Sequence, residues 1–327
     1  ICGSSLATAA TMGRVALPEL RRMGYSGSLS TGALAAGGTL GILIPPSVIL
    51  IIYSILTEQN IAKMFLAAFV PGILAAIGYL IAIAIFVRIK PDSGPPTSYV
   101  GWRQRLNLFG QVWQILVIFF LVIGGIYLGW FTPTEGASIG AAGTGIMALF
   151  TKGFNFSDLI DVIKDTAVTS AMIFLVLLGA EFFNSFIALT QITNELATFV
   201  ISNELSPYLV VFCILVLYIL LGCLMDSLAM ILLTIPVFFP IIIELDFGMS
   251  IEEVAIWFGI LTLIVVEVGL ITPPVGLNVF IINKMAKNVP ISDTFIGVLP
   301  FLISDLIRVG ILFIFPSISL FLIRLFG

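Results

Sequence analysis

The sequence has 327 residues, of which 60% are hydrophobic and only 10% are charged. Soluble domains carry about 25% charged residues, so a chain with a mean hydropathy of +1.20 has too few polar side chains to cover a water-exposed surface. The net charge of −4 and the lack of a basic run argue against nucleic acid as a partner. The absence of histidine excludes Ser-His dyads, histidine proton relays and most zinc sites.

The first residues are Ile1, Cys2 and Gly3, without an initiator methionine or a charged leader, and we expect earlier helices to precede them. The three cysteines, at positions 2, 213 and 223, form no CxxC pair and are expected to be small apolar residues inside a membrane. Segments long and apolar enough to span a bilayer follow in chain order: 29–56, 61–87, 109–128, 134–150, 166–189, 208–245, 254–282 and 295–325.

The stretch 208–245 is too long for one ordinary span. It contains Asp226 near its middle and Pro236 and Pro240 further on, which favours a re-entrant pair of half-helices. Residues 1–12 are expected to form the returning half of a similar hairpin. Residues 150–165 predict a short amphipathic segment on the membrane surface, with 194–203 as its counterpart on the other side.

Basic residues recur in alternate connections between the spans. The connections near 57–60, 129–132 and 190–207 contain no Lys or Arg. The positive-inside rule therefore places the basic connections in the cytoplasm. Their residues are Arg14, Arg21, Arg22, Arg88, Lys90, Arg103, Arg105, Lys152, Lys164, Lys284 and Lys287.

Two spans carry the same interruption. Residues 41–46 read Gly-Ile-Leu-Ile-Pro-Pro, and residues 269–274 read Gly-Leu-Ile-Thr-Pro-Pro. Each follows a possible hairpin, and the charge pattern makes the first broken helix run outward and the second inward. This arrangement is typical of an inverted-topology repeat.

The chemistry of the interruption favours a binding site over a simple kink. Consecutive prolines lack N–H groups and free backbone carbonyls, and the preceding glycine lets the chain leave helical geometry. Unpaired polar groups in hydrocarbon cost several kcal/mol each, so such a break persists where protein, water or an ion satisfies it. Freed carbonyls suit Na⁺, and half-helix N-termini suit a carboxylate. A kinked helix is the alternative, and it remains the interpretation for Pro71 and Pro300.

Several polar residues lie deep in these segments. Residues 3–11 are small and hydroxyl-rich, which fits either ligand binding or close helix packing. Asp226 and Glu267 each lie inside an apolar stretch, where a charge costs roughly 2.5–3.5 kcal/mol and points to function. Thr134 and Glu135 are expected to cap a helix N-terminus. Asp305 and Arg308 are expected to pair, as are other opposite charges three apart on a helix.

The sequence resembles the large membrane subunit of TRAP (tripartite ATP-independent periplasmic) transporters over nearly its whole length. The resemblance rests on residues 1–13 with Pro-Glu-Leu at 18–20, on 36–47, on Phe-Thr-Pro-Thr-Glu at 131–135, and on 267–278. It implies an all-α polytopic membrane protein with two re-entrant hairpins, two broken helices, and an elevator-type transport domain beside a scaffold. Residues 1–56 and 208–283 would form the two repeats of the transport domain. Residues 57–207 would form scaffold and connecting helices, and 284–327 a C-terminal scaffold helix.

The resemblance also implies a function, which is Na⁺-coupled uptake of a small organic acid across the bacterial inner membrane. The acid, such as a C4-dicarboxylate or sialic acid, would be delivered by a periplasmic substrate-binding (P) protein, with a small membrane (Q) subunit as second partner. The first Na⁺ site would use Gly3, Ser4, Ser5, Gly41, Ile44 and Pro46, and the second Gly222, Asp226, Gly269, Thr272 and Pro274. Substrate would contact Ser4, Thr8, Ser227 and Asn278.

A channel is the main alternative, because broken helices also build selectivity filters. The chain has no filter-like run of carbonyl-presenting residues, and an inverted repeat favours alternating access. An intramembrane enzyme would need a Ser-His dyad, which the lack of histidine excludes, or an aspartyl pair, for which Asp226 has no second deep aspartate because Asp246 lies at a segment end. The identity of the acid, the number of Na⁺ ions and the oligomeric state are left open by the sequence.

Overall fold

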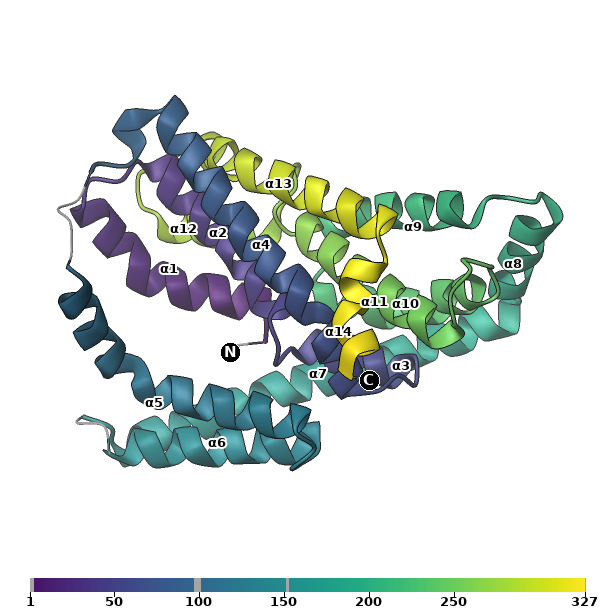
Figure 1. Ribbon diagram of the computed structural model, residues 1–327, viewed down its shortest axis with the longest axis horizontal. Coiled ribbons are helices and arrows are strands. Elements are labelled where there is room, and N and C mark those ends of the chain that lie inside the picture. The colour runs from purple at the N-terminus through teal and green to yellow at the C-terminus, as the bar shows by residue number, and fades with distance from the viewer. Residues whose placement is uncertain (1–2, 97–100, 151–152, 327) are drawn as a thin grey trace. The chain divides into compact units, whose positions relative to one another are not determined.

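A computed structural model describes residues 3–96, 101–150 and 153–326 (Figure 1). Ile1, Cys2 and Lys152, which enter the sequence predictions, lie outside the described residues. Within those residues all regular structure is helical, as predicted. The chain forms two compact units, Ile1–Pro95 with Phe182–Gly327, and Pro96–Glu181.

The larger unit contains the two interrupted segments. Its helices are α1 (Ser5–Arg22), α2 (Gly27–Leu43), α3 (Val48–Leu56), α4 (Ile61–Ile89), the 3-10 turn η1 (Pro91–Ser93), α8 (Ile192–Ser202), α9 (Pro207–Gly222), α10 (Ser227–Ile243), α11 (Ile251–Gly269), α12 (Leu277–Met285), α13 (Ile291–Ile314) and α14 (Ser317–Phe326). The smaller unit contains α5 (Trp102–Tyr127), α6 (Pro133–Phe150) and most of α7 (Phe156–Thr190), whose last turns belong to the larger unit.

The predicted breaks are present at both Pro-Pro pairs. Helix α2 ends at Leu43, and α3 starts after Ser47, whose hydroxyl accepts a hydrogen bond from Leu50 N–H at 3.3 Å. The two helices are bent by 44°. Helix α11 ends at Gly269, and α12 starts after Gly276, whose φ of +62° is readily available to glycine. Both Pro-Pro peptide bonds are cis.

Helix α11 forms the centre of the larger unit, because nearly every side chain from Val254 to Gly269 is buried. A helix that is apolar on all sides needs neighbours all round. Helix α11 contacts α2, α3, α4, α9, α10, α13 and α14. Helices α2 and α13 approach closely at Gly32 and Gly297, where an added Cβ would meet backbone atoms.

The helix contacts come in matched pairs across the two halves of the larger unit. Helix α1 contacts α2 and α12, and α10 contacts α11 and α3. Helix α2 contacts α4, α12 and α13, and α11 contacts α13, α3 and α4. Helices α1, α2, α3 and α4 thus correspond to α10, α11, α12 and α13, respectively. When each helix is exchanged for its counterpart, every contact named above becomes another contact that the structure contains.

A buried polar chain links α2, α4 and α13. The Tyr79 hydroxyl lies 3.0 Å from Thr39 Oγ1 and donates to Asp305 Oδ2 at 2.7 Å. Arg308 donates to Asp305 Oδ1 at 2.8 Å, which confirms the predicted pair. These hydrogen bonds replace water for groups that would otherwise be orphaned in an apolar interior.

Three predictions about element boundaries were wrong. Of the predicted surface segment 150–165, the described residues 156–165 do not form a separate element, because they are the first turns of α7, which continues to Thr190. Residues 295–325 form two helices, because Pro316 lacks the N–H to continue α13 and holds Phe315 outside helical geometry, at φ −120° and ψ 74°. The cap of α6 is Thr132 and not Thr134: Glu135 N–H donates to Thr132 Oγ1 at 3.3 Å, and Thr132 N–H to Glu135 Oε2 at 2.7 Å.

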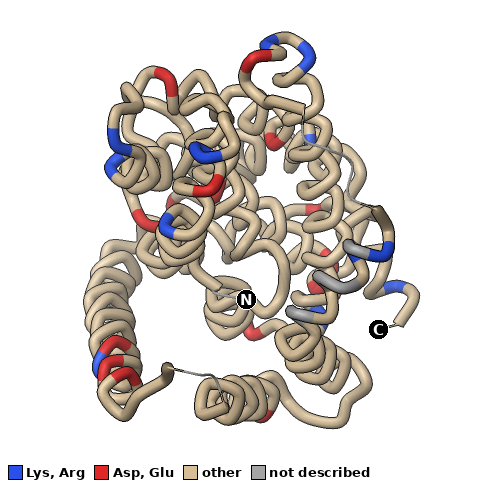
Figure 2. Tube along the Cα trace, turned by 90° about the vertical axis from the view of Figure 1, so that its left-hand side faces the viewer, with Lys and Arg blue, Asp and Glu red and all other residues tan. Residues whose placement is uncertain are grey.

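Among the described residues, α4, α7 and α13 are each long and apolar enough to cross a membrane, and the bent pair α2 and α3 adds another span if it is taken as one. Figure 2 shows Lys and Arg positions mainly in loops and towards helix ends, with long uncharged stretches between them. These features support a multi-pass membrane protein.

Candidate functional site

Helix α1, which corresponds to the predicted returning half of the first hairpin, begins beside the first Pro-Pro break. Gly3 has a φ of +63°, and a Cβ there would lie 3.1 Å from Val48 Cγ2 and 3.8 Å from the Pro46 carbonyl oxygen. Thr8 lies further along the same helix, and a Cβ at Gly41 would come within 2.5 Å of its Oγ1. The structure thus places Gly3 beside Pro46 and, separately, Gly41 beside Thr8, which was predicted as a substrate contact.

We call residues 3–5, at the start of α1, the first tip, and residues 222–227, between α9 and α10, the second tip. The second tip meets the second break in the same manner. A Cβ at Gly269 would lie 2.6 Å from Gly222 Cα, so the backbones of α9 and α11 touch where both helices end. The Cys223 thiol donates to the Ile219 carbonyl at 3.2 Å and contacts the Pro273 carbonyl at 3.5 Å. The sequence interpretation of Cys223 as a small apolar residue overlooked this contact between tip and break.

Glu267 joins the two tips. Ser5 Oγ donates to its Oε2, and Ser227 Oγ donates to its Oε1 at 2.8 Å. Both serines are first residues of their helices, following the N-caps Ser4 and Asp226. All three side chains are buried, with exposures of 1–2%. The sequence marked Glu267 as an anomalous deep charge, but it did not show that this residue lies between the tips.

Asn278 lies close to the same cluster. Its Nδ2 donates to the Ala35 carbonyl at 3.3 Å, and its buried Oδ1 has no hydrogen-bond partner among the residues that the structure describes. A Cβ at Gly38 would lie 3.1 Å from Asn278 Nδ2 and 3.1 Å from the Ser5 carbonyl oxygen. An orphaned oxygen at full burial is uncommon and is a candidate acceptor for a ligand.

Other predicted ligands use their side chains within their own helices. Ser4 Oγ caps α1, and the Ser4 carbonyl accepts from both the N–H and the hydroxyl of Thr8 at 2.9 and 2.7 Å. Asp226 Oδ2 accepts from Leu228 N–H, and Thr272 Oγ1 donates to the Val268 carbonyl. Ile44 and Pro274 are solvent- or lipid-exposed, and the described contacts do not join their side chains to a tip.

The donor set fits an alkali cation better than a transition metal. Within the described residues, no group of three or more His, Cys, Asp and Glu side chains is arranged to hold a metal ion. What the tips and breaks offer is backbone carbonyls, hydroxyls and single carboxylates, with tight glycine contacts that a Cβ would fill. Such oxygens at interrupted helices are the ligands that Na⁺-coupled transporters use.

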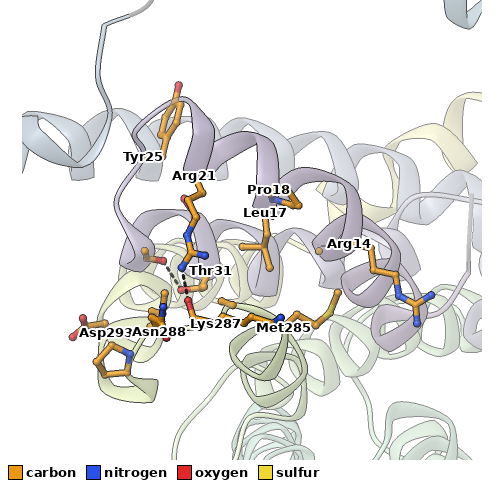
Figure 3. Close-up of a pocket in the computed structure, with 16 residues that line it drawn as sticks. Arg14, Leu17, Pro18, Arg21, Tyr25, Thr31, Met285, Lys287, Asn288 and Asp293 are labelled. Carbon is orange, nitrogen blue, oxygen red and sulfur yellow. Dashed lines mark hydrogen bonds between the residues drawn. The ribbon is translucent and has the colours of Figure 1, made fainter.

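A separate basic pocket of about 800 Å³ lies at the other end of α1 (Figure 3). It is lined by α1, the start of α2, and the loop from α12 to α13. Arg21 extends from α1 and donates to the Lys287 carbonyl, whereas Arg14 projects away from that contact. Ser26 N–H also donates to the Ser93 carbonyl at 3.0 Å. Three loops that the charge pattern assigned to one side therefore lie together, but the pocket contains no predicted site residue.

Comparison with known proteins agrees with this architecture. The family model described as "Tripartite ATP-independent periplasmic transporter, DctM component" matches residues 1–318. The C4-dicarboxylate TRAP transporter large permease protein DctM of Pseudomonas aeruginosa is 33% identical over 98% of this chain and 73% of its own length. The sialic acid TRAP transporter permease protein SiaT of Haemophilus influenzae is 31% identical over 98% of this chain, which spans 50% of that relative.

A third relative is the isethionate TRAP transporter permease protein DctMQ of Oleidesulfovibrio alaskensis, which is 28% identical over 98% of this chain and 49% of its own length. The match to the family model covers almost all of the sequence, both interrupted helices included. The chain belongs to the DctM family of tripartite ATP-independent periplasmic transporters and is a multi-pass, solute-transporting membrane subunit.

Proposed function

We propose that this subunit carries out Na⁺-coupled uptake of a small organic acid by alternating access. The observation that carries the proposal is the repeated meeting of tip and break. Gly3 lies beside Pro46 in the first half, and Gly222 touches Gly269 in the second. Backbone carbonyls at such breaks suit a cation, as do the C-terminal ends of α9 and α11, which meet at Gly222 and Gly269.

The matched helix contacts support an inverted repeat. Helices α1 to α4 and α10 to α13 make contacts that exchange with one another, and the two Gly-x-x-x-Pro-Pro motifs occupy equivalent places. When two oppositely directed copies of one unit exchange their conformations, the protein changes from a state open to one side of the membrane to a state open to the other side. This exchange is the structural basis of alternating access. An elevator movement of the hairpins and broken helices against a scaffold is the corresponding mechanism.

In this proposal the first ion is held near Gly3, Gly41 and Pro46, and the second near Gly222, Gly269 and the carbonyls after α11. The substrate carboxylate is placed between them, beside the N-terminal ends of α1 and α10, whose partial positive charge it would share with the Glu267 carboxyl group. Asn278 and the half-buried Thr8 supply polar contacts there.

The names of the relatives favour organic anions as the substrate class. These names specify a C4-dicarboxylate, sialic acid and isethionate, all of which are small and anionic. We therefore propose an acid of similar size, delivered by a periplasmic binding protein and transported together with a small membrane subunit. The proposed location is the bacterial inner membrane, because the periplasmic partner and the cytoplasmic product lie on its two sides.

Uptake into proteoliposomes tests this proposal. The whole protein and its partner subunits are reconstituted, and accumulation of a labelled acid is measured with an inward Na⁺ gradient and with K⁺ in its place. We expect concentrative uptake only with Na⁺. Equal accumulation in K⁺ would refute the coupling.

A channel would give a different kinetic result. A transporter loaded with unlabelled acid exchanges it for labelled acid, and this counterflow saturates with concentration. An open pore gives a flux that rises linearly and shows no counterflow. The experiment therefore separates the proposal from its main alternative in the same preparation.

A further inference from the structure

Glu267 contacts both hairpin tips with one carboxyl group. Its two oxygens accept from different serines, and these serines belong to α1 and α10, which are far apart in sequence. Ser5 and Ser227 are the first residues of those helices, so the contacts are made at the tips themselves. A movement of either tip away from α11 breaks one of the two hydrogen bonds.

Burial makes the ionised form of Glu267 costly unless positive charge lies nearby. Glu267 is 1% exposed, and among the residues that the structure describes no Lys or Arg forms an ion pair with it. Its hydrogen-bond partners are neutral hydroxyls, and the N-terminal ends of α1 and α10 add partial positive charge beside it. A buried carboxylate either takes up a proton or is stabilised by nearby positive charge, and a bound cation would add to the positive charge of the helix ends. Asp226, the cap of α10 next to Ser227, adds a second acidic side chain to the same region.

We propose that Glu267 acts as a latch and counter-charge shared by the two tips. Its hydrogen bonds hold both tips closed against α11, and its negative charge favours a cation at either tip. Closing of one tip therefore positions the carboxylate for the other, so the two ion sites behave as one unit. This inference rests on the proposed function, but it assigns to Glu267 a positioning role that the ion ligands alone do not imply.

The first test needs no ion. Ser5→Ala, Ser227→Ala and the double variant are compared by their thermal unfolding midpoints in detergent, both in the wild-type background and in the Glu267→Gln background. When a buried carboxylate loses both of its hydrogen-bond donors, the fold should be destabilised by more than twice the cost of losing one donor. With glutamate at position 267, we expect the unfolding midpoint of the double variant to fall by more than the sum of the two single decreases. With glutamine at position 267, we expect the decreases to add.

The control for the serines is Ser54→Ala. Ser54 is 1% exposed, as buried as Ser5 and Ser227, but its hydroxyl donates only within α3, to the Leu50 carbonyl at 2.7 Å. Its effect should add to that of Ser5→Ala. Additive losses for Ser5 and Ser227 with Glu267 present would overturn the latch. If the glutamine background does not fold, Glu267→Asp, which is too short to reach both serines, replaces it.

The second test measures the ion. Thermal unfolding is followed as Na⁺ replaces K⁺ at constant ionic strength, and the Na⁺ concentration giving half of the stabilisation is determined. We expect Glu267→Gln to raise it by about tenfold, whereas the exposed acid variant Glu181→Gln leaves it unchanged. An unchanged value in Glu267→Gln would overturn the counter-charge role.

The outcomes for the proposed function are separate. If Na⁺ fails to stabilise the wild-type protein, the proposed coupling ion and the counter-charge role are both refuted. The serine comparison still decides in that case whether Glu267 links the tips. If Na⁺ stabilises the wild type but the serine losses add, Na⁺ coupling stands and the latch is refuted.

Discussion

Replacing Gly269 with alanine tests the contact between the second tip and the second break. A Cβ at this position would lie 2.6 Å from Gly222 Cα and 2.7 Å from Gly222 C, which are backbone atoms without a flexible side chain to move. Carbon atoms in contact normally lie about 3.5–4.0 Å apart, so the two helix ends must separate by roughly 1 Å. Overpacking of this kind costs about 1–3 kcal/mol.

The separation should act on ion binding as well as on stability. If the whole cost falls on the closed, ion-binding state, the Na⁺ concentration for half-maximal uptake rises roughly fivefold to a hundredfold. We would measure uptake in proteoliposomes across a Na⁺ series, together with the thermal unfolding midpoint of the purified protein. Both should change, because the same backbone contact stabilises the fold and shapes the site.

The matched control is Gly37→Ala. Gly37 also lies in a long helix, α2, but a Cβ there meets no atom within 4 Å. Alanine favours helix over glycine by about 1 kcal/mol, so this variant should be neutral or slightly stabilised. If Gly269→Ala behaved like Gly37→Ala in both assays, the tight meeting of tip and break would not matter for binding, and the reasoning would be refuted.

Three further predictions concern the rest of the chain. Arg308→Met leaves the buried carboxylate of Asp305 without its cation and should lower the free energy of unfolding by about 3–5 kcal/mol. Adding Asp305→Asn should restore part of this loss. A double variant no more stable than Arg308→Met alone would contradict this. The pKa of Glu253, which precedes the predicted span at 254–282, is lowered mainly by its hydrogen bond to an arginine of α14. The ionised Glu253 therefore stabilises the folded state above pH 4.5, and this stabilisation is lost as the pH falls through the lowered pKa. Unfolding midpoints of wild type and Glu253→Gln should therefore differ at pH 7 and converge in acid, and a constant difference would count against the pair. Thr132→Ala should cost about 0.5–2 kcal/mol by removing the cap of α6, whereas Thr134→Ala should cost little, as measured by thermal unfolding; equal losses would restore Thr134 as the cap.

The sequence predicted the main features of the fold because the membrane permits few solutions. Apolar length located α4, α7, α13 and the bent pair α2 and α3, which are four of the eight predicted spans. The two Pro-Pro pairs located the breaks after α2 and α11, since proline cannot continue the hydrogen-bonded ladder. The Asp305 and Arg308 pair followed from helical spacing alone. Helix boundaries were less well predicted. The split between α13 and α14 depends on the position of a single proline, Pro316, and the continuity of α7 depends on packing.

The candidate site was predicted in part. The family resemblance assigned Gly3, Pro46, Gly222 and Gly269 to ion sites, and in the structure Gly3 lies beside Pro46 and Gly222 beside Gly269. The sequence assigned Ser5 to an ion and Ser227 to the substrate, although their described hydroxyl contacts go to Glu267. Their roles as ion and substrate ligands remain predictions, as do those of the remaining site residues.

What the sequence by itself determined is local: which segments are apolar, where the helices must break, and which polar residues lie at depth. These properties depend on residues adjacent in the chain and on the energetic cost of unpaired groups in lipid. What only the tertiary structure decided is which distant groups meet. The contact of Glu267 with both Ser5 and Ser227 requires α1, α10 and α11 to converge, and no pattern in the sequence specifies that convergence because it arises from packing across 262 positions of chain.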